Sequence, residues 1–141
     1  MTTVATRGRL DLWLFCLTAL AGGTAANAIW MLVAPAAWYR DLPAGVPDTG
    51  PYNAHFVRDI GCAFATMAVA LGLAAWRPRW RAPLLLVVAL FFAAHAGLHV
   101  FDTLRGALDA DHWALDFPGV HAPALLLVAL AVAALRRDAH A

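Results

Sequence analysis

The run Pro83-Leu-Leu-Leu-Val-Val-Ala-Leu-Phe-Phe-Ala-Ala-His95-Ala-Gly-Leu-His99-Val-Phe101 decides the fold, because its only ionisable side chains are two histidines. A stretch of this length and composition can cross a bilayer as a helix. Asp102 follows directly, and on a helix positions 95, 99 and 102 fall within roughly 40° of one another. Ionisable side chains are costly inside a membrane and by default suggest function there. The stretch therefore predicts a membrane helix with a polar stripe.

The composition of the whole chain also indicates a membrane protein. Of its 141 residues, 62% are hydrophobic and 13% are charged, and the mean hydropathy is +0.68. A soluble domain contains about half apolar and about a quarter charged residues. We therefore expect residues 1–141 to form a single transmembrane domain in contact with the lipid bilayer. The sequence offers no basic soluble surface, so we do not expect nucleic-acid binding.

Three further apolar runs bring the number of predicted spans to four, over residues 12–34, 55–76, 83–104 and 117–135. The first run is longer than the apolar core of a signal peptide, so we expect it to be retained. Residues 35–54 contain four prolines and two glycines. Because these residues interrupt helices and favour turns, the segment is predicted to be one long outer connection. The pattern predicts an all-α integral membrane four-helix bundle.

The arginines predict how this bundle is oriented. Four spans place seven arginines on the side of both termini and three on the other side. Basic residues concentrate on the cytoplasmic side of membrane proteins, so we expect both termini to be cytoplasmic. The seven are Arg7, Arg9, Arg77, Arg79, Arg81, Arg136 and Arg137; the three are Arg40, Arg58 and Arg105.

This topology gathers polar side chains at the outer end. The second span opens with several of them, and the third span ends with several more. If these two helices are neighbours, their polar ends form one pocket. We expect the pocket to be lined by His55, Asp59, His95, His99 and Asp102 as candidate metal ligands, and by Asn27, Asn53, Arg58 and His121 as candidate ligand-binding residues. Asn53 is also the expected N-cap of the second span.

A metal ion is one interpretation of this pocket. Imidazoles suit zinc, copper or iron, and carboxylates complete or orient their ligand shells. His95 and His99 are spaced i, i+4, as are the two histidines of an HExxH motif, although the glutamate is missing. The expected function is then binding of a metal ion or small ligand, in redox or proton-transfer chemistry.

Three other interpretations stay open. The cluster is a structural network in which Arg58 pairs with Asp59 or Asp102. Alternatively, it holds a membrane-soluble ligand such as a quinone, or a haem between His55 and His95. Finally, the chain is a non-catalytic subunit of a membrane complex or a homo-oligomer, because small residues in its spans allow helices to approach closely.

Two segments carry a resemblance to a known group. They are Gly50-Pro-Tyr-Asn53-Ala-His55-Phe-Val-Arg58-Asp59-Ile-Gly61 and His95-Ala-Gly-Leu-His99-Val-Phe-Asp102. With them, the chain resembles small four-helix bacterial membrane proteins that are loosely DoxX-like. The resemblance covers the four-span layout and the polar start of the second span. It implies a bacterial cytoplasmic (inner) membrane and quinone-linked complexes as partners, and it carries over no catalytic residue.

Overall fold

The computed structural model describes residues 3–139, with side chains from Leu12 to Ala139. The side chains of Arg7 and Arg9, which entered the charge argument, lie outside the described residues. All regular structure in the described part is helical. The elements are α1 (Thr3–Val33), α2 (Pro35–Asp41), η1 (Val46–Thr49), α3 (Ala54–Trp76), η2 (Pro78–Trp80), α4 (Arg81–Leu104), α5 (His112–Leu115), η3 (Phe117–His121) and α6 (Ala122–Asp138).

Four helical segments are long and apolar enough to cross a membrane, as the hydrophobic runs predict. They are Leu12–Val33, Ala54–Trp76, Pro78–Leu104 and Phe117–Asp138. The third begins before the predicted residue 83, because Pro78 and Pro83 stand near helix N-termini, where a missing N–H costs nothing. The fourth extends to Asp138, since Arg136 and Arg137 in its last turn interact favourably with the helix dipole.

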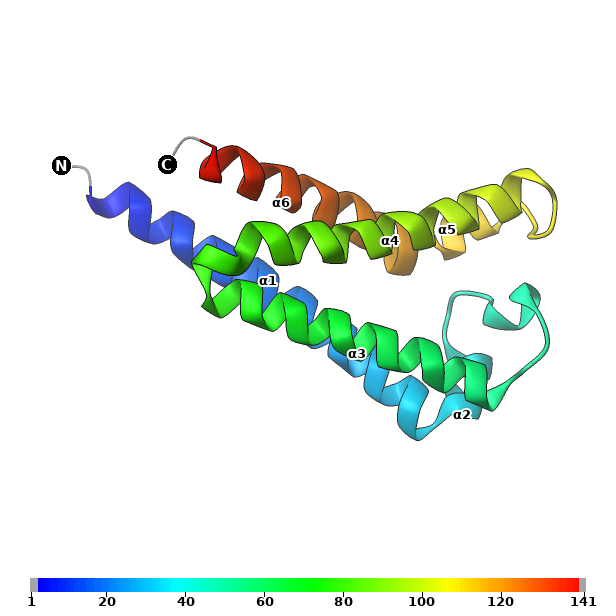
Figure 1. Ribbon diagram of the computed structural model, residues 1–141. Coiled ribbons are helices and arrows are strands. Elements are labelled where there is room, and N and C mark those ends of the chain that lie inside the picture. The colour runs from blue at the N-terminus through cyan, green and yellow to red at the C-terminus, as the bar shows by residue number, and fades with distance from the viewer. Residues whose placement is uncertain (1–2, 140–141) are drawn as a thin grey trace.

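The long helices form two antiparallel pairs. Helix α1 packs along α3, and α4 packs along α6 (Figure 1). The pairs meet where α3 turns into α4, at the end of the molecule that carries both chain termini, and they diverge toward the opposite end. We call these the termini end and the loop end.

Apolar side chains from all four long helices pack together toward the termini end. Trp13 of α1 is buried there, and Leu17, Leu71, Leu85 and Leu127 are fully buried, one from each helix. Removing these side chains from contact with lipid or water and packing them closely gives many small dispersion gains. This cluster is what joins the two pairs.

Arg81 closes the C-terminus of α3 at the same end. Its guanidinium is buried, with Nε donating to the carbonyl of Ala74 (3.1 Å) and Nη2 to that of Ala75 (3.4 Å). The last carbonyls of a helix have no partner within it, so a basic side chain there satisfies them. The guanidinium also lies over the ring of Trp13, 5.0 Å from its centroid. Arg81 therefore holds α1, α3 and α4 together.

The connection over residues 35–54 contains more regular structure than its prolines suggest. Helix α2 starts at Pro35, a residue whose fixed φ suits a first helical position. Further along, the Tyr39 hydroxyl donates to the carbonyl of Gly50 (2.7 Å), and its ring packs against Tyr52. Asn53 caps α3 as predicted, its side chain accepting from the backbone N–H of His55 (3.0 Å) and of Phe56 (3.1 Å).

Candidate functional site

The structure divides the predicted pocket into separate groups. His55 and Asp59 contact each other on α3, with Nε2 and Oδ2 3.3 Å apart, and their side chains are 88% and 61% exposed. Their helix buries the opposite face, where Gly61 is so close to α1 that an added Cβ would stand 3.0 Å from the Cβ of Met31. Residues two positions apart on a helix point in nearly opposite directions. Asp59 therefore faces outward because Gly61 faces α1.

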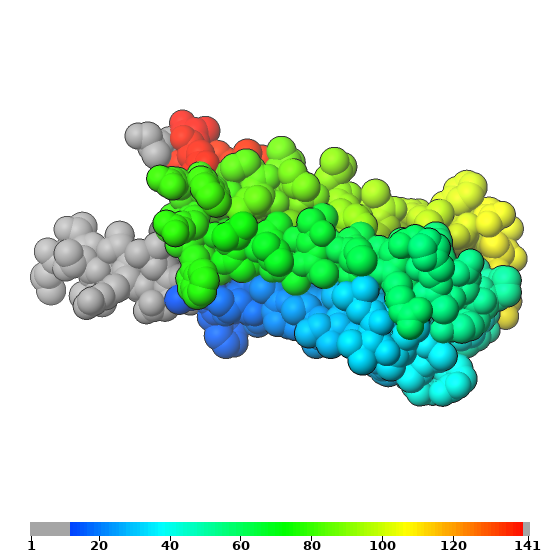
Figure 2. Space-filling view, turned by 60° about the horizontal axis from the view of Figure 1, so that its bottom comes forward, coloured from blue at the N-terminus to red at the C-terminus, as the bar shows by residue number. Residues whose placement is uncertain are grey.

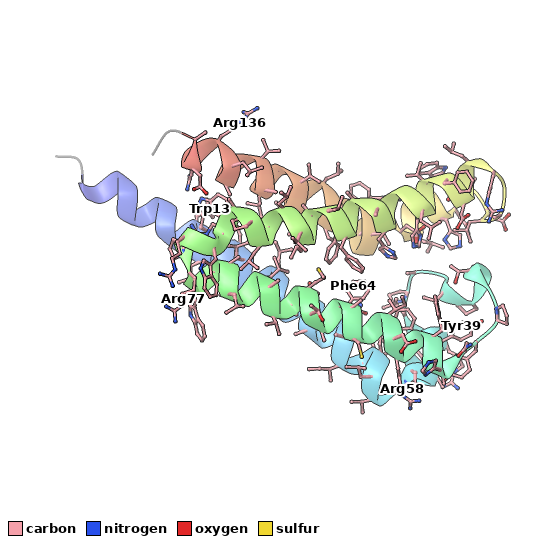
Figure 3. The ribbon with its side chains drawn as sticks, in the orientation of Figure 1. Trp13, Tyr39, Arg58, Phe64, Arg77 and Arg136 are labelled. Atoms are coloured by element: carbon pink, nitrogen blue, oxygen red, sulfur yellow. The ribbon has the colours of Figure 1, made fainter. Side chains whose placement is uncertain are left out.

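Arg58 and Asp102 also take separate partners. Arg58 points away from α4 and α6 (Figure 3) and donates its Nε to the carbonyl of Leu32 on α1, at 3.2 Å. Asp102 accepts from Nε of Arg105 at 2.7 Å, one turn further along the chain. Within the described side chains, the ion pair considered for Arg58 with Asp59 or Asp102 is not formed.

Asn27 has a structural contact in the half of α1 nearer the loop end. Its Oδ1 accepts a hydrogen bond from Nε1 of Trp38, at 2.8 Å. Trp38 belongs to α2, so this bond holds α2 against α1. Asn27 and Asn53 thus both stabilise the connection between α1 and α3, Asn27 as an acceptor for the Trp38 indole and Asn53 as a helix cap.

A second polar group forms around Asp116, whose side chain is 1% exposed. Nδ1 of His99 lies 2.8 Å from Oδ2 of Asp116, and Nδ1 of His112 lies 3.4 Å from the same oxygen. On its other side, Nε2 of His112 lies 3.4 Å from Oδ2 of Asp48. The Asp48 side chain is 65% exposed, so this group connects a buried carboxylate to the surface.

The backbone around Asp116 fixes the position of its carboxylate. The Asp116 carbonyl accepts from the N–H of Val120 (2.8 Å) and of His121 (3.2 Å), and the second bond makes η3 a turn of π-helix. Pro118 stands at the start of this turn, where its missing N–H does no harm. Single π-turns occur frequently at functional sites.

His95 continues the group toward the middle of the third span. Its ring centroid is 4.8 Å from that of His99. The ring also stacks on Phe91 at 6.3 Å and meets the edge of Phe64 at 6.0 Å. Phe64 points from α3 toward α4 (Figure 3), so His95 lies where the two helix pairs face each other. His121 stacks separately on Trp113, at 6.1 Å.

Two buried polar atoms of the group lack a hydrogen-bond partner among the described residues. They are Nδ1 of His112 and Oδ1 of Asp116. Buried polar atoms are nearly always paired, and exceptions call for an explanation such as a catalytic role or a bound water. These atoms give the group one unused acceptor, and one ring nitrogen whose role depends on its tautomer.

The sequence analysis did not select Asp48, His112 or Asp116. His112 and Asp116 are spaced i, i+4, and Asp116 immediately precedes an apolar run with Pro118 close behind. That combination could have predicted a polar group at the start of the fourth span. Asp48 is 64 residues from its partner His112, and no local pattern links the two. The space-filling view shows their two connections meeting at the loop end (Figure 2).

The donor geometry and surface of the described part bear on what this group can bind. No three His, Cys, Asp or Glu side chains in residues 12–139 are arranged to hold one metal ion. Two grooves with apolar linings were found, one along α1 and α3 and the other along α4 and α6, and none of the His or Asp residues above lines either of them. The arrangement around Asp116 suits proton transfer between adjacent side chains.

The molecule is defined by four membrane-length helices and a buried His–Asp–His group at the loop end. Comparison with models of known families, with curated proteins and with solved structures found no match. The resemblance to DoxX-like proteins therefore stays a prediction.

Proposed function

We propose that the protein transfers protons between the water at its loop end and His95 inside the third span. The single observation that carries this proposal is the row of neighbouring ionisable side chains from Asp48 through His112, Asp116 and His99 to His95, in which hydrogen bonds join Asp48 to His112 and Asp116 to His99. Successive polar atoms are 3.4, 3.4 and 2.8 Å apart, and the last two rings are 4.8 Å apart between centroids.

The residue types in this series can each accept and release a proton. An imidazole can accept a proton on one nitrogen and release one from the other. Carboxylates between imidazoles orient the rings and serve as acid or base. The unused oxygen of Asp116 supplies a further acceptor beside His112. Ionisable groups of this kind inside spans often form proton relays.

The series ends at His95, inside the third span, and this end point limits the function that we propose. Toward the termini end, the next buried residues on α4 are Phe92, Ala89, Val88 and Leu85, which cannot carry a proton. Passage across the whole membrane is therefore not part of the proposal. We propose proton exchange with a small ligand that reaches His95, with no requirement for a metal ion.

The cellular orientation is part of the same proposal. The excess of arginines at the termini end supports cytoplasmic termini in a bacterial inner membrane. The loop end then faces the outside, and Asp48 takes its protons from the external water.

The proposal can be tested by deuterium exchange of the histidine rings. Protein labelled with ¹⁵N-histidine in detergent micelles is transferred to D₂O, and the loss of each ring N–H signal is followed by NMR. In Asp116→Asn, the amide cannot pass on a proton. We expect exchange at His95 and His99 to slow by about 100-fold, the lower limit of what a positioned acid or base supplies.

His55 provides an internal control, because its exposed ring lies outside the series. Its exchange should be the same in the wild type and in Asp116→Asn. The proposal is wrong if His95 and His99 exchange as fast in the variant as in the wild type while the fold is retained. His112→Gln gives an independent second interruption of the series.

A second candidate function is that of a subunit in a larger membrane complex. It is favoured by the groove of about 440 Å³ on the α1–α3 pair, whose lining includes Ala21, Gly22, Ala25 and Ala65. Such small residues let another helix approach closely. Replacing Ala25 with leucine should then reduce recovery of a copurifying partner without changing histidine exchange.

A further inference from the structure

A second charged group lies at the termini end, away from the proton-transfer series. The ring of Trp13 is buried, and two guanidinium groups lie over it, those of Arg81 and Arg137, each 5.0 Å from the ring centroid. The two arginines come from different helices, α4 and α6. Figure 3 shows Trp13 at the same end of the molecule as Arg77 and Arg136.

The positive charge of this group is not balanced by the described carboxylates. In residues 12–139, no carboxylate oxygen lies within 4.0 Å of a nitrogen of the five arginines at this end. These are Arg77, Arg79, Arg81, Arg136 and Arg137. Like charges on one aromatic ring repel each other, and an anion placed between them relieves that repulsion.

The two guanidinium groups differ in how they are held. Arg81 is buried and has Nε and Nη2 bound to the carbonyls of Ala74 and Ala75, so its position is fixed. Arg137 is exposed in the last turn of α6, and its long side chain can reorient. The Arg137 side chain can therefore reorient to contact an anion that is already bound to the fixed Arg81. Guanidinium groups are well suited to phosphate, because their N–H groups match its oxygens in pairs.

The position along the helices indicates where the anion comes from. Trp13 lies near the start of the first span, Arg81 near the start of the third and Arg137 near the end of the fourth. Tryptophan and arginine at span ends occupy the level of the lipid headgroups. Basic clusters at that level attract anionic lipids.

We propose that Arg81, Arg137 and Trp13 form a binding site for the phosphate of an anionic phospholipid headgroup. The fixed Arg81 and the exposed Arg137 hold the phosphate, and the ring of Trp13 contacts both guanidinium groups. This site does not depend on the proton-transfer function, because the two groups share no residue.

Native mass spectrometry of the full chain tests the proposal. The detergent-purified protein is titrated with phosphatidylglycerol, and the dissociation constant of the first bound lipid is measured. A hydrogen bond to a charged group is worth about 1.5–3 kcal/mol, so Arg137→Gln should weaken this binding by at least about tenfold. Phosphatidylcholine, whose headgroup has no net charge, should bind the wild type more weakly and respond little to the substitution.

Arg136→Gln is the matched control, because it removes the same charge from the neighbouring position, and of these two arginines Arg137 is the one that lies over Trp13. It should weaken binding of phosphatidylglycerol by no more than about fivefold, the general contribution of one arginine near a surface. Equal losses in the two variants would show general surface attraction and overturn the site. Displacement of the lipid by millimolar inorganic phosphate would also overturn the assignment to a lipid. Because both positions are exposed at the end of α6, unchanged melting temperatures should accompany both substitutions.

Discussion

The two ends of this molecule hold the helix pairs together by different means. At the termini end, apolar side chains from four helices interlock, and Arg81 ties three of those helices to one another. At the loop end the pairs diverge, and the contacts between them include that of His112 with Asp48. The difference teaches that the packed apolar cluster and the buried His–Asp contacts lie at opposite ends of the molecule. Side chains at the loop end can change charge without disturbing the packed cluster.

The largest effect is expected at the termini end. Leu85 is fully buried, and Leu85→Ala leaves a cavity among four helices. We expect the free energy of unfolding to fall by about 2–5 kcal/mol, measured by denaturant unfolding in mixed micelles. Leu86 is next to it but 51% exposed, so Leu86→Ala should cost less than about 0.5 kcal/mol. Equal losses at the two positions would contradict a packed cluster at this end.

A smaller effect is expected in the polar group at the loop end. Asp116→Asn weakens the bond to His99 and leaves buried polar atoms poorly matched. We expect a loss of about 1–3 kcal/mol in the free energy of unfolding. Asp48 is mostly exposed, so Asp48→Asn should cost less than about 1 kcal/mol in the same measurement. If Asp48→Asn proves as costly as Asp116→Asn, the loop end depends on the surface contact rather than on the buried one.

The smallest effect concerns the cap of α3 at the loop end. Asn53 accepts from two backbone N–H groups there, just as Arg81 satisfies two carbonyls at the other end of this helix. Asn53→Ala should reduce the free energy of unfolding by about 1 kcal/mol, and Asn53→Gly by only a few tenths. The alanine variant should speed amide exchange in the first turn of α3 more than elsewhere. An even increase along the chain would argue against a local cap.

The sequence predicted the parts of the fold that depend on local pattern. The lengths of the apolar runs were enough to locate four membrane-length helices. An asparagine directly before the second run was enough to predict the N-cap at Asn53. The outward direction of His55 and Asp59 depends on which face of α3 meets α1. Gly61 carries that information, because only a residue without a side chain permits so close an approach.

The polar group around Asp116 could not be assembled in the same way. His99 belongs to a regular helix, but Asp48, His112 and Asp116 lie in or beside the short elements of the two connections. The conformation of such segments follows from contacts far apart in the chain, such as that between Asp48 and His112. Hydrophobic periodicity holds no information about those contacts.

The short η2 connection (Pro78–Trp80) has a mechanical consequence. Each pair of helices behaves as a stiff arm, and the arms are joined near one end. For arms of about 35 Å, a rotation of only about 5° at the joint displaces the far tips by about 3 Å. Small angular strain is therefore magnified with distance from the joint, and the link between Asp48 and His112 is where such leverage is greatest.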